Sequence, residues 1–155
     1  MDTNSKKNRI TYIVPWSSTS CIQHNSVDVI ISHSVLEHVA NLAGTYTALY
    51  EWLKPGGRMS HQIDFSSHNL SRTWNGHWAC SELLWKVIAG NRPFLINRQP
   101  VSTHVQLIKK SGFEILCAMR NNREDGIVKS QFSRHWKNLS ESDAMCSNAL
   151  IQAKK

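Results

Sequence analysis

The fold is decided by the stretch Val27-Asp-Val-Ile-Ile-Ser32 and by the helical pattern directly after it. A near-continuous apolar run of this kind is typical of a parallel strand that is covered on both faces. From Val35 to Leu53, apolar residues recur at steps of three and four, which predicts a helix with a candidate break at Asn41. The helix should end at Lys54-Pro-Gly-Gly57, where a basic residue, a proline and two glycines form a strong terminator.

A second strand is predicted directly after this terminator, from Arg58 to Phe65. A strand, a helix and a second strand in this order form a right-handed crossover unit with parallel strands. The class is therefore α/β, an open sheet with helices on its faces. The other expected elements are a short strand at 10–14, helices capped by Ser81 and by Ser102, a strand at 113–119, a short helix near 140–146 and a last, edge strand at 149–153.

Length and composition exclude several classes of protein. The 155 residues are enough for one domain, and no stretch approaches the ~20 apolar residues that cross a bilayer. The polar start, residues 1–9, has no apolar signal region and should be disordered. The four cysteines are widely spaced, which argues against a zinc module and a disulfide framework. We therefore expect a cytoplasmic protein with free thiols and no membrane contact.

The formal charge of +7 suits an anionic partner, but its distribution weakens that interpretation. The basic residues are dispersed, and no run of five or more occurs. A basic nucleic-acid-binding module is therefore retained only as a secondary alternative.

Several motifs carry a resemblance to a known family. The segments Val35-Leu-Glu-His-Val39 and Leu53-Lys-Pro-Gly-Gly57 resemble the middle of a class I S-adenosylmethionine-dependent methyltransferase of type 11-like character. In that family they follow the fourth strand and precede the fifth. The resemblance runs from about Ile10 to the C-terminus, with 10–14 matching the third strand, 113–119 the sixth, and 149–154 the antiparallel seventh. It implies a mostly parallel Rossmann-like sheet, S-adenosylmethionine as cofactor, and methyl transfer to an oxygen or nitrogen of a small-molecule or glycan acceptor.

One departure from the family pattern bears on activity. The family holds its cofactor with a glycine-rich loop after the first strand and an acidic residue after the second, yet this sequence has no G-x-G pattern. The chain therefore resembles the C-terminal part of the domain, a partial domain over 1–155, and alone should bind S-adenosylmethionine weakly or not at all. An alternative is a non-catalytic half-domain or remnant, which would associate with itself or with a partner chain through an exposed sheet edge.

Candidate cofactor-binding residues follow the first strand of the crossover. Ligands of open parallel sheets bind at the carboxyl ends of the strands. In the resembling family, the exit of the fourth strand packs against the methionine part of the cofactor, which assigns that role to Ser32, His33 and Ser34. The alternative is that the serines cap the strand-to-helix turn and His33 is simply exposed.

Candidate acceptor-side residues follow the second strand. Asp64 and His68 both lie beyond the predicted strand end and can converge, and His68 or His77 could act as the general base that takes a proton from the acceptor. Loop hydrogen bonding is the alternative for both histidines. Glu37 is expected to have a structural role at the start of a helix, and we expect no metal site because no ligands are closely spaced. The remaining substrate-side candidates are Trp74 and Trp78, which could stack on a flat acceptor or plug the core, and Arg98, which could hold an anionic acceptor or be solvated.

Overall fold

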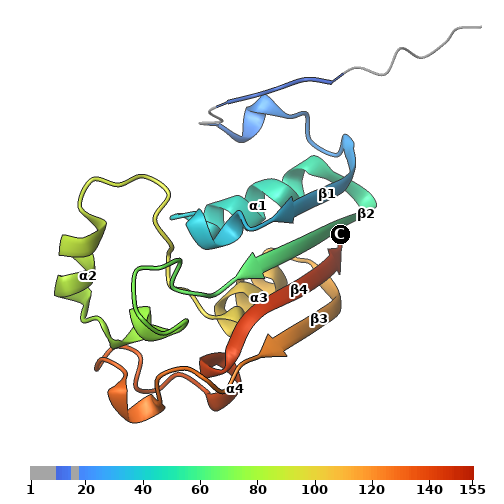
Figure 1. Cartoon of the computed structure of the whole chain (residues 1–155). Coiled ribbons are helices and arrows are strands. Elements are labelled where there is room, and N and C mark those ends of the chain that lie inside the picture. The colour runs from blue at the N-terminus through green and yellow to red at the C-terminus, as the bar shows by residue number, and fades with distance from the viewer. Residues whose placement is uncertain (1–9, 15–17) are drawn as a thin grey trace, which may run out of the picture.

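The computed structural model describes residues 10–14 and 18–155, and its centre is a four-stranded open sheet (Figure 1). The strand order is β1-β2-β4-β3. β1 pairs parallel with β2, and β4 pairs antiparallel with both β2 and β3, so three strands point one way and the last points back. The predicted open sheet with an antiparallel C-terminal strand is confirmed. The strands are β1 Val27–His33, β2 Leu53–Asp64, β3 Glu114–Asn122 and β4 Cys146–Lys154.

The helices begin at side chains that satisfy their first amides. Asn41 accepts a hydrogen bond of 3.0 Å from the backbone of Gly44, and so divides the predicted helix into a 3-10 turn and α1. Ser81 caps α2 as predicted. Ser102 does not cap α3, because this helix begins at Val101, directly after Pro100, and already contains Ser102. The α-helices are α1 Leu42–Trp52, α2 Glu82–Ala89, α3 Val101–Lys110 and α4 Glu141–Ala144, and the 3-10 turns are Thr19–Cys21, Leu36–His38, Gly76–Ala79 and Lys129–Gln131.

Two strand predictions are wrong. Residues 10–14 form no strand and are exposed. They do not pair with β1, which is an edge of the described sheet. The C-terminal strand is not an edge strand, because β4 lies between β2 and β3 and is hydrogen-bonded on both sides. Its residues Ala149, Ile151 and Ala153 are fully buried, while β3 takes the edge.

One face of the sheet is covered by α1 and α3, and the main core lies between them and the strands. This core contains two histidines. Tyr46 of α1 shares a hydrogen bond of 2.8 Å with Nδ1 of His104 on α3, and His61 of β2 shares one of 2.7 Å with the hydroxyl of Ser32. Each histidine thus has one satisfied ring nitrogen inside an otherwise apolar core.

The opposite face of β1 remains open. Ile31 is 75% exposed and Val29 is 56% exposed, because no helix among the described residues covers this side of the strand. Within the described part of the chain, β1 therefore presents both an unpaired backbone edge and an apolar surface.

No helix in residues 10–14 and 18–155 combines the length and the apolar character that a membrane crossing needs. The four cysteines are free thiols, as predicted. The prediction that residues 1–9 are disordered lies outside the described residues.

The buried histidines should make the fold sensitive to acid. Burial lowers the pKa of His61 from 6.5 to about 4 and, with a smaller effect from His61, the pKa of His104 to about 3. Below pH 6.5 the histidines of the unfolded chain become protonated, while the buried histidines of the folded chain stay neutral. The free energy of unfolding is therefore highest above pH 6.5 and falls between pH 6.5 and about pH 4. Each buried histidine should lower the free energy of unfolding by about 1.4 kcal/mol for each pH unit in that window.

Urea unfolding at several pH values between 7.5 and 5 measures this loss. The variant His104→Leu should show a shallower decline than the wild type, and His135→Ala, at an exposed histidine, should show the same decline. A free energy of unfolding that stays constant from pH 7 to 5 in the wild type would contradict the prediction.

Candidate functional site

The carboxyl ends of β1, β2 and β3 meet on one side of the molecule, where α2 also lies, and β4 starts from the same side (Figure 1). Two open hollows lie there, of about 310 and 360 Å³. They share Asp64, Ser66 and Arg123 and so form neighbouring parts of one surface. This is the position at which open parallel sheets bind their ligands.

Two of the three predicted cofactor residues line the first hollow, namely His33 and Ser34. Ser34 has a φ of 51°, an uncommon conformation for a residue with a side chain, and its amide donates to the Gln62 carbonyl at 2.9 Å. Ser32 is different, because side chains alternate along a strand and its hydroxyl turns inward to His61. The structure therefore brings His33 and Ser34, but not Ser32, to the hollow.

Asp64 and His68 converge, as the sequence predicts. The Oδ2 atom of Asp64 lies 3.4 Å from Nε2 of His68, and its Oδ1 atom accepts a hydrogen bond of 2.8 Å from the amide of Ser66. His68 also has a positive φ, 48°. Both side chains line the second hollow, so a carboxylate and an imidazole face the same space.

Glu37 is the functional candidate whose surroundings the sequence does not predict. Its side chain is 3% exposed, and neither carboxylate oxygen has a hydrogen-bond partner among the described residues. Burial raises the pKa of the Glu37 carboxyl, while its own backbone amide, His38 and His68 lower this pKa and Asp64 raises it further. A small cavity of about 10 Å³ lies against Glu37 and Asp64. The only sequence signal is the acidic residue itself, in a short turn far along the chain from His68.

The predicted catalytic residue His77 is buried, 2% exposed. Burial, aided by Arg98 and His68, lowers the pKa of His77 to about 3, so the ring is a neutral base at physiological pH. It lies against Trp78, with ring centroids 4.7 Å apart. Its burial leaves it far less accessible to an acceptor than His68.

Trp74 and Trp78 belong to a second, smaller core beneath the loop that follows β2. Trp78 is fully buried and its indole N–H donates to the Arg98 carbonyl at 3.0 Å. A ring without exposed surface cannot stack on an acceptor, which corrects that interpretation of Trp78 and fits the core alternative. Trp74 is 8% exposed, and Arg123 lies 5.8 Å above its ring. This core is completed by Phe132, Trp136 and Leu139.

Arg98 is not free to hold an anionic acceptor in this arrangement. The residue is 5% exposed, and its guanidinium donates to Glu82 at 2.6 Å and to the Cys80 carbonyl at 3.1 Å. The same group lies 4.4 Å from the centre of the Trp85 ring. Burial lowers the pKa of Arg98, and Glu82 opposes that effect. Arg98 therefore fastens the segment between α2 and α3 to the end of the loop after β2 and to the start of α2.

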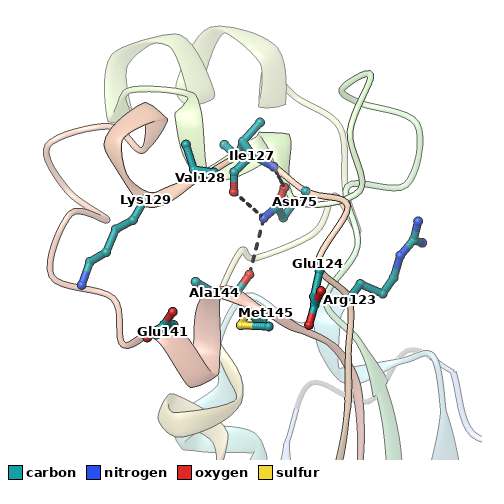
Figure 2. Close-up of a pocket in the computed structure, with 10 residues that line it drawn as sticks. Asn75, Arg123, Glu124, Ile127, Val128, Lys129, Glu141, Ala144 and Met145 are labelled. Atoms are coloured by element: carbon teal, nitrogen blue, oxygen red, sulfur yellow. Dashed lines mark hydrogen bonds between the residues drawn. The ribbon is translucent and has the colours of Figure 1, made fainter.

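A third hollow, of about 410 Å³, lies between the end of β3 and α4 (Figure 2). Asn75 stands at its wall and accepts from the Ile127 amide at 2.7 Å while its own amide donates to the carbonyls of Ile127 and Ala144. This hollow also contains Arg123, which it shares with the two hollows beside β2. Among the described residues, Arg123 is the one that borders all three hollows.

The fold and this surface define an α/β protein of Rossmann-like architecture with a ligand side at the carboxyl ends of its parallel strands. A family model described as a methyltransferase domain matches residues 4–118, which is more than half of the chain. The chain belongs to this methyltransferase domain family, and the family expectation drawn from the sequence motifs is confirmed. S-adenosylmethionine as the cofactor expected for such a domain is supported by the S-adenosylmethionine-dependent enzymes among its structural neighbours.

Solved structures share the fold at low sequence identity. An S-adenosylmethionine-dependent methyltransferase from Mesorhizobium loti is 17% identical, with a TM-score of 0.53 over 86% of this chain and 64% of the other. An S-adenosylmethionine-dependent methyltransferase from Methanosarcina mazei is 14% identical, with a TM-score of 0.57 over 86% of this chain and 61% of the other. A third match is the complex of the Haloferax volcanii Trm112 methyltransferase activator with a methyltransferase. The sequence identity is 15% and the TM-score is 0.51, over 86% of this chain and 55% of the other. This chain thus spans less than two thirds of these relatives, and no curated protein matches it.

The bonds from Arg98 to Glu82 and to the Cys80 carbonyl, here called the Arg98 clamp, should make this arginine more important for stability than a solvated arginine. Arg98→Lys removes the planar fork and its bonds to Glu82 and Cys80, and should lower the free energy of unfolding by about 2 kcal/mol. Arg72→Lys, at an exposed arginine in the loop after β2, should change the free energy of unfolding by less than about 0.5 kcal/mol. Urea unfolding of both variants is the measurement, and equal stability of Arg98→Lys and wild type would contradict the clamp.

Proposed function

We propose that this chain is part of an S-adenosylmethionine-dependent methyltransferase that moves a methyl group to an oxygen or nitrogen of a small-molecule or glycan acceptor. Membership of the methyltransferase domain family is the observation that carries the proposal. The reaction itself asks little of the protein beyond in-line positioning and removal of one proton.

The cofactor side of the proposed site is the end of β1. His33 and Ser34 line the hollow there, and the strained backbone of Ser34 is held by its bond to Gln62 of β2. Strain that surrounding structure maintains is common at ligand sites. Ser32 contributes indirectly, because its bond to His61 fixes the end of the strand.

The acceptor side of the proposed site is the loop after β2. Asp64 and His68 face a shared hollow, and His68 is more accessible than His77. Asp64 lies 3.4 Å from Nε2 of His68, and this exposed imidazole is the proposed group that receives the acceptor's proton. Trp74 completes the wall of this hollow and remains the aromatic candidate for acceptor contact.

Titration of the full chain with S-adenosylmethionine, followed by amide NMR, tests the cofactor side. We expect weak binding with shifts concentrated at residues 32–34 and 62–64, because the sequence holds no glycine-rich loop to complete the cofactor site. Ser34→Gly should keep the backbone conformation and His33→Ala should weaken the shifts. Shifts confined to other parts of the chain, or none at millimolar cofactor, would remove the cofactor role of this strand end.

A second candidate function is that of a half-domain that acts in association with another chain. The edge of β1, unpaired among the described strands, and its exposed Val29 and Ile31 favour it, since such an edge is a template for strand pairing. The methyltransferase from Haloferax volcanii was solved in a complex with an activator protein, which supports association as a mode of action for this fold.

Light scattering on a size-exclusion column tests this association. The wild-type chain should elute above the 17.7 kDa of one copy as its concentration rises, and Ile31→Lys should shift it toward that mass. Thr47→Lys adds the same charge at an exposed position of α1 and should leave the elution unchanged. A wild-type monomer at every concentration argues against self-pairing through β1.

A further inference from the structure

A cluster of side chains beside the two hollows has the composition of a metal site. Glu37, His38 and His68 each offer one ligand atom, and these atoms all lie within 4.8 Å of one another. Two ligands come from the turn after β1 and the third from the loop after β2, so the strand pairing brings them together. We propose that these three residues bind a divalent transition-metal ion, with Zn²⁺ the best match to two imidazoles and one carboxylate.

The state of Glu37 is the strongest argument for an ion. Glu37 is 3% exposed, and both of its carboxyl oxygens lack a hydrogen-bond partner among the described residues. The ionised form of such a group is costly unless a cation or hydrogen-bond donors lie beside it. Nearby Arg98 is engaged with Glu82 and the Cys80 carbonyl, so its charge is already compensated. A metal ion would give the Glu37 oxygens the partner that they lack.

The orientation of His38 is that of a metal ligand. Its Nδ1 atom lies 2.7 Å from the carbonyl oxygen of Phe94, and because a carbonyl only accepts, Nδ1 must carry the proton and donate it. The neutral ring then has its lone pair on Nε2, free to bind a metal. A backbone carbonyl that fixes the tautomer in this way is the usual support of metal-bound histidine.

Asp64 adds negative charge beside the cluster. Its carboxylate lies 3.4 Å from Nε2 of His68. Glu37 and Asp64 together carry two negative charges when ionised, and neutral histidines add none. A divalent cation balances this pair.

The size of the site fits with a small adjustment. Ligand atoms of a tetrahedral zinc ion with bonds of about 2.1 Å lie about 3.4 Å apart, so a pair at the 4.8 Å limit must close by about 1.4 Å. His68 is an exposed loop residue and can make this movement. The ion would lie at the wall of the hollow that Asp64 and His68 line, with its open coordination position available to an acceptor oxygen.

The rival occupant is water. The cavity beside Glu37, about 10 Å³, is close to the space that one water molecule needs. In that case Glu37 is satisfied by solvent, His68 remains a base, and no metal binds. The two occupants differ in a direct binding measurement, which does not depend on methyl transfer.

Calorimetric titration of the full, untagged, chelator-treated chain with Zn²⁺ is the test, with thermal unfolding as a second readout. We expect one ion per chain and a higher melting temperature with zinc. His68→Gly removes a ligand and suits the positive φ at this position, so it should fold and bind zinc at least about tenfold more weakly. His135→Ala, at an exposed histidine outside the cluster, should bind like the wild type.

Three results would overturn the site: no zinc binding, zinc binding that His68→Gly leaves intact, or preference for Mg²⁺, which favours oxygen ligands alone. Glu37→Gln provides an independent check. If it folds, it should lose both the zinc affinity and the zinc-dependent gain in melting temperature, and retention of either contradicts the proposal.

Discussion

The parallel pairing of β1 with β2 is the interaction on which the rest of this structure depends. Its register sets Ser32 opposite His61 and His33 opposite Gln62, so the two strands end together. The turn after β1 and the loop after β2 then leave the sheet side by side. The site residues that follow β1 and β2, among them Ser34, Asp64 and His68, owe their positions to that shared end.

Much of the fold follows from local patterns. The apolar run of β1, the terminator before Arg58 and the caps Asn41 and Ser81 are short-range signals, and they predict the crossover unit and α2. Strand order is a long-range property, which is why local patterns wrongly predict a strand at 10–14 and an edge position for β4. Nothing within Ala149–Ala153 reveals that two neighbours flank it.

The site is predictable only where its members are close in the sequence. Asp64 and His68, four residues apart beyond one strand, are expected to converge and do. Ser32 lies at the end of a strand, and this location predicts that it lines the hollow. Because side chains alternate between the two faces of a strand, its hydroxyl points to the core instead, where it meets His61. Glu37 and His38 meet His68 across about 30 residues, and no spacing rule connects them. The sequence predicts contact roles for Trp78 and Arg98 because loops often bind ligands. Trp78 instead belongs to the second core, and Arg98 is bound to Glu82 and to the Cys80 carbonyl.

The central place of β4 has a consequence for how the polypeptide acquires its shape on the ribosome. Among the described strands, β3 has β4 as its sole neighbour, and β2 pairs with β1 on its other side. Until residues 146–154 have left the exit tunnel, β3 therefore has no strand of this sheet to dock against and only the first β-α-β unit can assemble. The sheet is therefore completed only after residues 146–154 have been synthesised, and until then β3 has no strand partner among the strands described.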